Sequence, residues 1–125
     1  MGDVEDIFNN YVLDRSVSQK MRKRLERHTL HLYVDGELDM KTASQLKNMI
    51  DIDIDRKGIR TVILHMDNLH FIDSSGLGVI LGRYKKLLPL GGQIRLTNVP
   101  PHLYRIMELS GLPKIIEFTQ EETAL

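Results

Sequence analysis

The chain has 125 residues, of which 42% are hydrophobic and 27% are charged, as in an ordinary globular protein with one domain. Seventeen basic and seventeen acidic residues give no net charge, so no nucleic-acid or membrane partner is indicated. Cysteine is absent, which excludes disulfides, thiolate catalysis and cysteine-ligated zinc. The sequence shows neither a signal peptide nor an apolar run of membrane-spanning length, and we expect a cytoplasmic protein.

The first 28 residues differ in charge from one half to the other. Residues 1–14 contain no base, and their apolar residues recur at helical spacing. Residues 15–28 are basic, but they lack the interleaved aromatic residues that stack on nucleic-acid bases, so an exposed edge strand is the better interpretation. We expect residues 1–20 to be an N-terminal extension, either a short amphipathic helix or disordered, and residues 21–125 to form the domain.

Strands and helices alternate along the rest of the chain. Apolar and polar residues alternate over 29–35, which predicts a half-buried strand. Asp39 can cap a helix over 40–55 with an apolar stripe of Ala43, Leu46 and Ile50, and Gly58 ends this unit. Further elements are expected as a buried strand at 61–64, a helix from the serine pair to Pro89, a strand at 93–97, a helix from Pro101 and a last strand at 115–118. This alternation predicts an α/β fold with one mixed, largely parallel sheet and α-helices packed against it.

The segment 71–79 places Asp73, Ser74 and Ser75 where a helix begins after an apolar strand. The first turn of a helix has unpaired N–H groups and a partial positive charge, so a phosphate attached there would find donors. Asp and Ser are also common helix caps, and both serines are plausible as caps. The segment alone is compatible with either interpretation.

The helix after the serines carries glycines that are costly in a helix, at about 1 kcal/mol each relative to alanine. The spacing predicts that one side faces the sheet, namely Leu77, Ile80, Leu81, Tyr84 and Leu88. The opposite side then carries Gly78, Val79, Gly82, Arg83 and Lys86. Gly76 is explained by a close approach of helix and strand, whereas Gly78 and Gly82 suggest a flat face on which another protein docks, with Arg83 and Lys86 at its border.

The run 73–85 closely resembles the bacterial anti-sigma-factor antagonists, and most of all their sporulation branch. These proteins belong to the sulfate-transporter and anti-sigma-factor-antagonist (STAS) domain group. Residues 36–39, followed by Thr42 and Ala43, look like the first loop of the family, and residues 110–116 resemble its C-terminal signature. Order and spacing agree from about residue 22 to 120.

The resemblance implies a protein that is not an enzyme and needs no cofactor. Its unphosphorylated form is expected to bind an anti-sigma factor that is itself a serine kinase, and so to release the sigma factor. The kinase would phosphorylate Ser74, and a PP2C-type phosphatase would reset the switch. Together with the glycine-rich face, the expected partner contacts are Gly36, Glu37, Leu38, Asp39, Asp73, Ser75, Gly76, Gly78, Val79, Gly82, Arg83 and Lys86.

Enzymatic interpretations fit the sequence poorly. A dinucleotide-binding loop needs its third glycine one residue earlier than Gly82, and an acidic residue after the next strand is missing. The nucleophile elbow of a serine hydrolase needs glycine two residues before and after the serine, which neither Ser74 nor Ser75 has.

Two further alternatives concern ligands. His65, Asp67 and His70 cluster in the sequence near the serines, but zinc-type spacing is absent and no metal is expected. A STAS module that acts without phosphorylation, as a scaffold or as a sensor of a small ligand, remains open, although it would have no need of Ser74.

Overall fold

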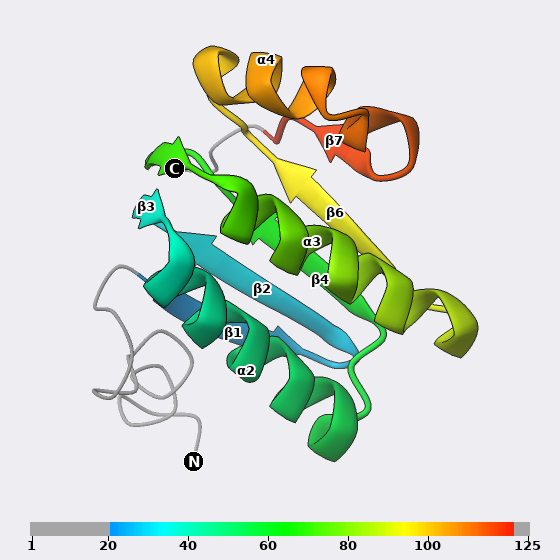
Figure 1. Ribbon diagram of the computed structural model, residues 1–125. Coiled ribbons are helices and arrows are strands. Elements are labelled where there is room, and N and C mark those ends of the chain that lie inside the picture. Colours follow the sequence, from blue (N-terminus) through cyan, green and yellow to red (C-terminus); the bar gives the residue numbers. More distant parts are fainter. Residues whose placement is uncertain (1–20, 122–125) are drawn as a thin grey trace.

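The computed structural model describes residues 21–121 as an α/β domain (Figure 1). The main sheet has five strands in the order β1-β2-β4-β6-β7, and β3 and β5 form a second, two-stranded sheet. Only the β1–β2 pair of the main sheet is antiparallel. The strands are β1 (Met21–Glu26), β2 (Thr29–Val34), β3 (Gly36–Leu38), β4 (Thr61–His65), β5 (Leu69–Ile72), β6 (Gln93–Thr97) and β7 (Glu117–Thr119). The predicted mixed, largely parallel sheet is confirmed.

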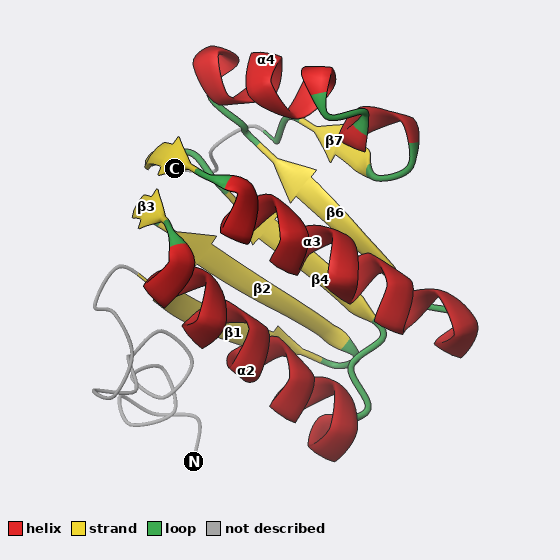
Figure 2. Ribbon diagram, in the orientation of Figure 1, coloured by secondary structure: helices red, strands yellow, loops and turns green. Residues whose placement is uncertain are grey.

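Helices α2 (Met40–Lys57) and α3 (Ser74–Leu87) lie side by side across one face of the sheet, and α4 (Pro101–Leu109) lies beyond β6 (Figure 2). The core forms between this face and the helices. Leu30, Leu32 and Val34 of β2 are fully buried in it, as their alternation predicts. His31 and Tyr33 alternate with them and therefore belong to the opposite face.

Helix α2 has local signals at both ends. Asp39 is its N-cap, and Gly58 ends it in the left-handed conformation (φ 65°) that glycine adopts without strain. The buried stripe includes Ala43, Leu46 and Ile50. The cap, the stripe and the glycine stop were all predicted, and the helix runs two residues past the expected end.

Strand β1 confirms the expected basic edge strand. Among the strands of residues 21–121 it pairs with β2 alone, and its bases form ion pairs with nearby carboxylates. These pairs are Arg22 with Asp35, Lys23 with Asp53, and Arg24 with Glu26. The positive charge of this segment is thus largely matched within the domain.

Two segments differ from the prediction. Residues 36–38, expected as a loop, form β3, because Gly36 turns the chain (φ 79°) and β5 supplies a parallel partner. The last strand begins at Glu117 rather than at 115, because Leu112–Lys114 forms a short 3₁₀ helix after α4. A second 3₁₀ turn, Leu88–Leu90, continues α3.

The expected N-terminal extension, residues 1–20, lies outside the described residues, so its form stays a prediction. Among residues 21–121, none of the helices combines the length and the apolar composition that a bilayer-spanning segment needs.

Candidate functional site

The candidate site lies where two helices begin next to each other. Strands β3 and β5 pair in parallel, with a register shift between Gly36 and Glu37, so that Leu38 lies opposite Ile72. The next residue of each strand, Asp39 and Asp73, is the N-cap of α2 and α3 respectively. The backbone N–H of Asp73 also donates to the carbonyl of Leu38, at 3.3 Å. The small sheet therefore brings two positive helix ends and two carboxylates together.

Asp73 alone caps α3. Its Oδ1 accepts hydrogen bonds from the backbone N–H groups of Ser75 (2.8 Å) and Gly76 (3.2 Å). The expectation that Ser74 or Ser75 serves as a cap is wrong, because both serines lie inside the first turn of the helix. A side chain caps from the residue just before the helix, and that residue is Asp73.

Ser74 is the first residue of α3 and is exposed. Within residues 21–121 its hydroxyl takes part in no hydrogen bond, so no structural role occupies it. It follows Asp73 directly and lies at the N-terminus of the helix, which carries the positive end of the helix dipole. An enzyme that transfers a phosphoryl group can reach this hydroxyl without unfolding the helix.

The neighbouring cap is built as a capping box. The backbone N–H of Thr42 donates to Asp39 Oδ1 (3.0 Å), and the backbone N–H of Asp39 donates to the Thr42 hydroxyl (2.9 Å). The Thr42 hydroxyl in turn donates to the carbonyl of Glu37 (2.8 Å). The hydrogen bond from the Thr42 backbone keeps the pKa of Asp39 below its ordinary value. Asp39 therefore stays ionised beside the serine segment at neutral pH.

Gly76 is required by packing, as predicted. A Cβ atom built on it would lie 2.8 Å from the carbonyl oxygen of Leu38 and 2.8 Å from Cγ1 of Ile72. Gly78 and Gly82 are different, because a Cβ atom on either would meet nothing within 4 Å. The absence of side chains at these two positions is not a requirement of the fold.

The predicted orientation of α3 is wrong in part. Arg83, expected on the outer face, is 8% exposed, and its Nε lies 3.1 Å from Asp51 Oδ1 of α2, as an ion pair without hydrogen-bond geometry. Lys86 also pairs with Asp51, at 3.4 Å. Conversely, Leu87 is fully buried, whereas Leu88, expected in the core, is 57% exposed. The helix is rotated because the pairing with α2 orients its basic side.

The structure separates the predicted contact residues into two groups. Four are buried in the domain and support the site from below, namely Gly36, Leu38, Gly76 and Arg83. The others remain wholly or partly accessible, namely Glu37, Asp39, Asp73, Ser75, Gly78, Val79, Gly82 and Lys86. The accessible group surrounds the N-terminus of α3 and continues along it.

Sequence reasoning missed an apolar groove beside α3. It has a volume of about 160 Å³ and is lined by Leu77, Gly78, Leu81, Ser110, Gly111, Leu112 and Ile115. The segment 110–116 stood out in the sequence only through its family likeness. Nothing in the local pattern shows that this turn packs beside the serine helix, because the contact joins residues about thirty positions apart.

Of the three residues His65, Asp67 and His70 that cluster in the sequence, His65 lies with His31 and Tyr33 on the face of the sheet opposite α2 and α3. His65 stacks on Tyr33, with ring centroids 4.2 Å apart, and its Nε2 lies 2.9 Å from Nδ1 of His31. Burial lowers the pKa of both histidines, and the charge of Arg24 for His31 and of His31 for His65 adds to this. Within the described part of the chain, no three metal-ligating side chains gather in a metal-like group.

The sequence of this chain is similar to those of known proteins. The STAS domain family matches residues 20–124. The anti-sigma F factor antagonist of Paenibacillus polymyxa is 40% identical over 77% of this chain and 82% of its own length. The anti-sigma-B factor antagonist of Listeria monocytogenes is 32% identical over 78% of this chain and 86% of its own length.

Solved structures of the anti-sigma factor antagonist SpoIIAA are similar as well. The unphosphorylated form has a TM-score of 0.68 and 26% identity, and covers 82% of this chain and 89% of its own. The phosphorylated form has a TM-score of 0.69 and 28% identity, and covers 82% of this chain and 91% of its own. The chain therefore belongs to the STAS domain family.

Proposed function

We propose that this protein is an anti-sigma factor antagonist that is switched by phosphorylation of Ser74. Its unphosphorylated form binds an anti-sigma factor and thereby frees the sigma factor. The anti-sigma factor acts as the serine kinase that modifies Ser74, and a PP2C-type phosphatase removes the phosphate. The observation that carries the proposal is the exposed, unengaged hydroxyl of Ser74 at the N-terminus of α3, in a chain 40% identical to an anti-sigma F factor antagonist.

The electrostatics favour a switch that acts at the interface and leaves the fold intact. A phosphate adds nearly two negative charges, which the helix N-terminus stabilises by only about 0.3–1 kcal/mol. The carboxylates of Asp73 and Asp39 oppose it by a comparable amount. In an interface, an unmatched charge costs several kcal/mol, and about 2.7 kcal/mol already weakens binding a hundredfold.

The proposal is tested by incubating the protein with ATP and the purified anti-sigma factor from the same genome. Mass spectrometry should place the phosphate on Ser74, the Ser74→Ala variant should remain unmodified, and Ser75→Ala should be modified like the wild type. The phosphorylated protein should bind the anti-sigma factor at least about a hundredfold more weakly. Phosphate on Ser75 alone would refute the site, and equal binding of both forms would refute the switch.

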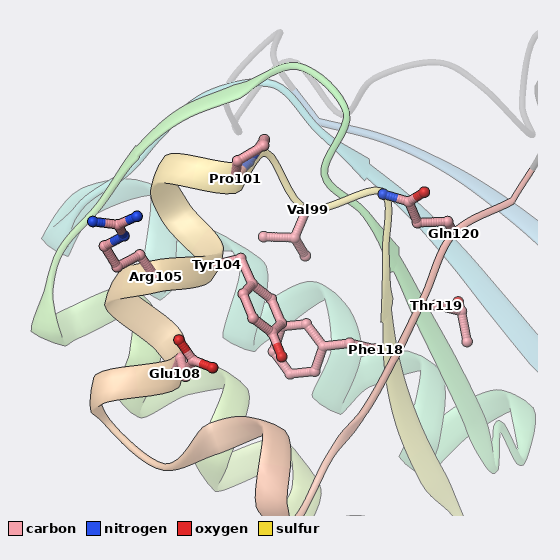
Figure 3. A pocket seen from close by; sticks show the side chains of 8 residues that line it. All are labelled: Val99, Pro101, Tyr104, Arg105, Glu108, Phe118, Thr119 and Gln120. Atoms are coloured by element: carbon pink, nitrogen blue, oxygen red, sulfur yellow. The ribbon is translucent and has the colours of Figure 1, made fainter.

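One observation supports a second candidate function, the sensing of a small ligand. A pocket of about 500 Å³ lies between α4 and β7. Its walls include Tyr104 and Phe118, whose rings meet edge to face at 5.3 Å, with Arg105 and Glu108 at the rim (Figure 3). Its volume is in the range of small-molecule sites. A metabolite that raises the melting temperature of the wild type but not of Tyr104→Ala would support this function.

A further inference from the structure

The groove beside α3 has the size of one large side chain. It lies between the helix and the turn that follows α4, and leucines form much of its wall. Its volume is about 160 Å³. Dry apolar cavities of about 150 Å³ accommodate a benzene molecule, so a phenylalanine or leucine side chain fits this space.

The groove shares a side of α3 with the proposed phosphorylation site. At 100° per residue, Ser74, Gly78, Leu81 and Lys85 fall within about 60° of each other around the helix axis. Gly78, which lines the groove, lies one turn after Ser74, about 6 Å along the axis. A partner that fills the groove therefore lies over the serine hydroxyl as well.

The rim of the groove exposes apolar side chains. Ile115, which lines it, is 47% exposed, and Leu109, next to the lining residue Ser110, is 84% exposed. Gly78 leaves the groove open, and a Cβ atom there would have no atom of the domain within 4 Å, so packing does not exclude a larger residue at its Cβ. A helix glycine that packing does not require, beside exposed apolar residues, is typical of a surface shaped for another protein.

Two charged residues next to the groove indicate which charge a partner would need there. Lys85 of α3 and Lys114 of the turn are both exposed. Neither forms an ion pair with any carboxylate of residues 21–121, in contrast to Lys86 and Lys47, which pair with Asp51. Lys85 follows the lining residue Leu81 by about one helical turn, and Lys114 directly precedes the lining residue Ile115. These two ammonium groups would complement carboxylates on a partner that fills the groove.

We propose that the groove receives one large apolar side chain of the anti-sigma factor, and that carboxylates flanking this side chain pair with Lys85 and Lys114. This inference rests on the proposed function and adds the chemistry of the docking segment. It also accounts for the effect of phosphorylation on binding. A phosphate on Ser74 lies about one helical turn from the groove and repels the same carboxylates of the partner. An acidic segment with an apolar anchor is thus bound before phosphorylation and rejected after it.

The test measures binding of the purified anti-sigma factor from the same genome by titration calorimetry. Gly78→Leu closes the groove with a good helix former, and Asn48→Leu adds the same side chain at an exposed position of α2. Gly78→Leu should weaken binding at least about thirtyfold, as loss of an anchor does, whereas Asn48→Leu should bind like the wild type. Both variants should melt no earlier than the wild type.

A second pair of variants tests the rim without altering the helix. Ile115→Ser removes an apolar rim residue, and Ile52→Ser removes a similarly exposed isoleucine of α2. Because both residues are 47–49% exposed, both variants should fold. Only Ile115→Ser should weaken binding, by about tenfold.

The charge of the partner segment is tested by the double variant Lys85→Glu, Lys114→Glu, with Lys57→Glu as the single-charge control at the far end of α2. The double variant should bind at least about tenfold more weakly, and its binding should no longer fall as salt is added. Binding that becomes tighter would show a basic segment and overturn the proposal.

The remaining outcomes separate this inference from the proposed function. If Ser74→Asp loses binding but Gly78→Leu and Ile115→Ser bind like the wild type, the groove is not the docking site and the proposed function stands. If the wild type does not bind the anti-sigma factor at all, both fail. If the protein forms dimers that Gly78→Leu disrupts, the groove holds a second copy of the chain and the proposal is wrong.

Discussion

Oδ1 of Asp73 lies 2.8 Å from the backbone nitrogen of Ser75, so that Asp73, and neither Ser74 nor Ser75, caps helix α3. The carboxylate caps the helix, whereas neither serine hydroxyl forms a hydrogen bond with any residue of 21–121. Ser74 can therefore be modified without loss of the cap. The same arrangement makes the acid, and not either serine, the residue on which the stability of the helix depends.

Removal of the cap should destabilise the domain. Asp73→Ala should lower the free energy of unfolding by about 1 kcal/mol, because two backbone N–H groups lose their acceptor. Ser74→Ala and Ser75→Ala should each change it by less than about 0.5 kcal/mol. Urea unfolding followed by circular dichroism measures all three. A larger loss for Ser75→Ala than for Asp73→Ala would contradict the assigned cap.

Substitution of two glycines of α3 by alanine should change the free energy of unfolding in opposite directions. Gly76→Ala should cost about 1–3 kcal/mol, because its Cβ would press against the backbone oxygen of Leu38. Gly78→Ala should stabilise the domain by up to about 1 kcal/mol, since its Cβ meets nothing and alanine favours the helix. Thermal melts of both variants test this. Destabilisation by Gly78→Ala would show that the fold itself requires this glycine.

The buried Arg83 of α3 should contribute more to stability than the partly accessible Lys86. Arg83→Met keeps the apolar stem but removes the charge opposite Asp51, which is only 21% exposed, and should cost about 2 kcal/mol. Lys86→Met should cost less than about 1 kcal/mol, because its ammonium is more accessible to water. Chemical unfolding compares the two variants, and equal costs would argue against the role assigned to Arg83.

The stability of the domain should depend on pH through the histidine pair. Because the pKa values of His31 and His65 are lowered in the fold, the unfolded chain binds more protons once the pH falls below about 6.5. The free energy of unfolding should therefore decrease as the pH is lowered from about 7 to 5. His65→Phe, which keeps a ring beside Tyr33, should flatten this decrease.

The control for the pH experiment is His28→Gln, which removes a histidine from an exposed turn. This variant should retain the wild-type decrease in stability between about pH 7 and 5. If His65→Phe and His28→Gln both leave the decrease unchanged, other groups cause it and the histidine pair does not.

Much of the fold could be predicted because its signals are local. The alternation in β2, the cap at Asp39 and the stop at Gly58 each lie within a few residues of the element that they define, and the structure confirms them. The short strand β3 could not be predicted, because its three residues become a strand only through pairing with β5, more than thirty residues later. The 3₁₀ turn that delays β7 also depends on packing after α4.

The sequence by itself determined the α/β architecture, the serine at the start of a helix and the glycines along it, since these follow from periodicity, capping and composition. Tertiary structure decided which side of α3 is available to a partner. Asp51 of α2 holds Arg83 against the domain, and the turn after α4 forms a groove at Gly78. Both effects arise from contacts between elements distant in the chain, and a helical pattern fixes the spacing of side chains but not the rotation of the helix against its neighbours.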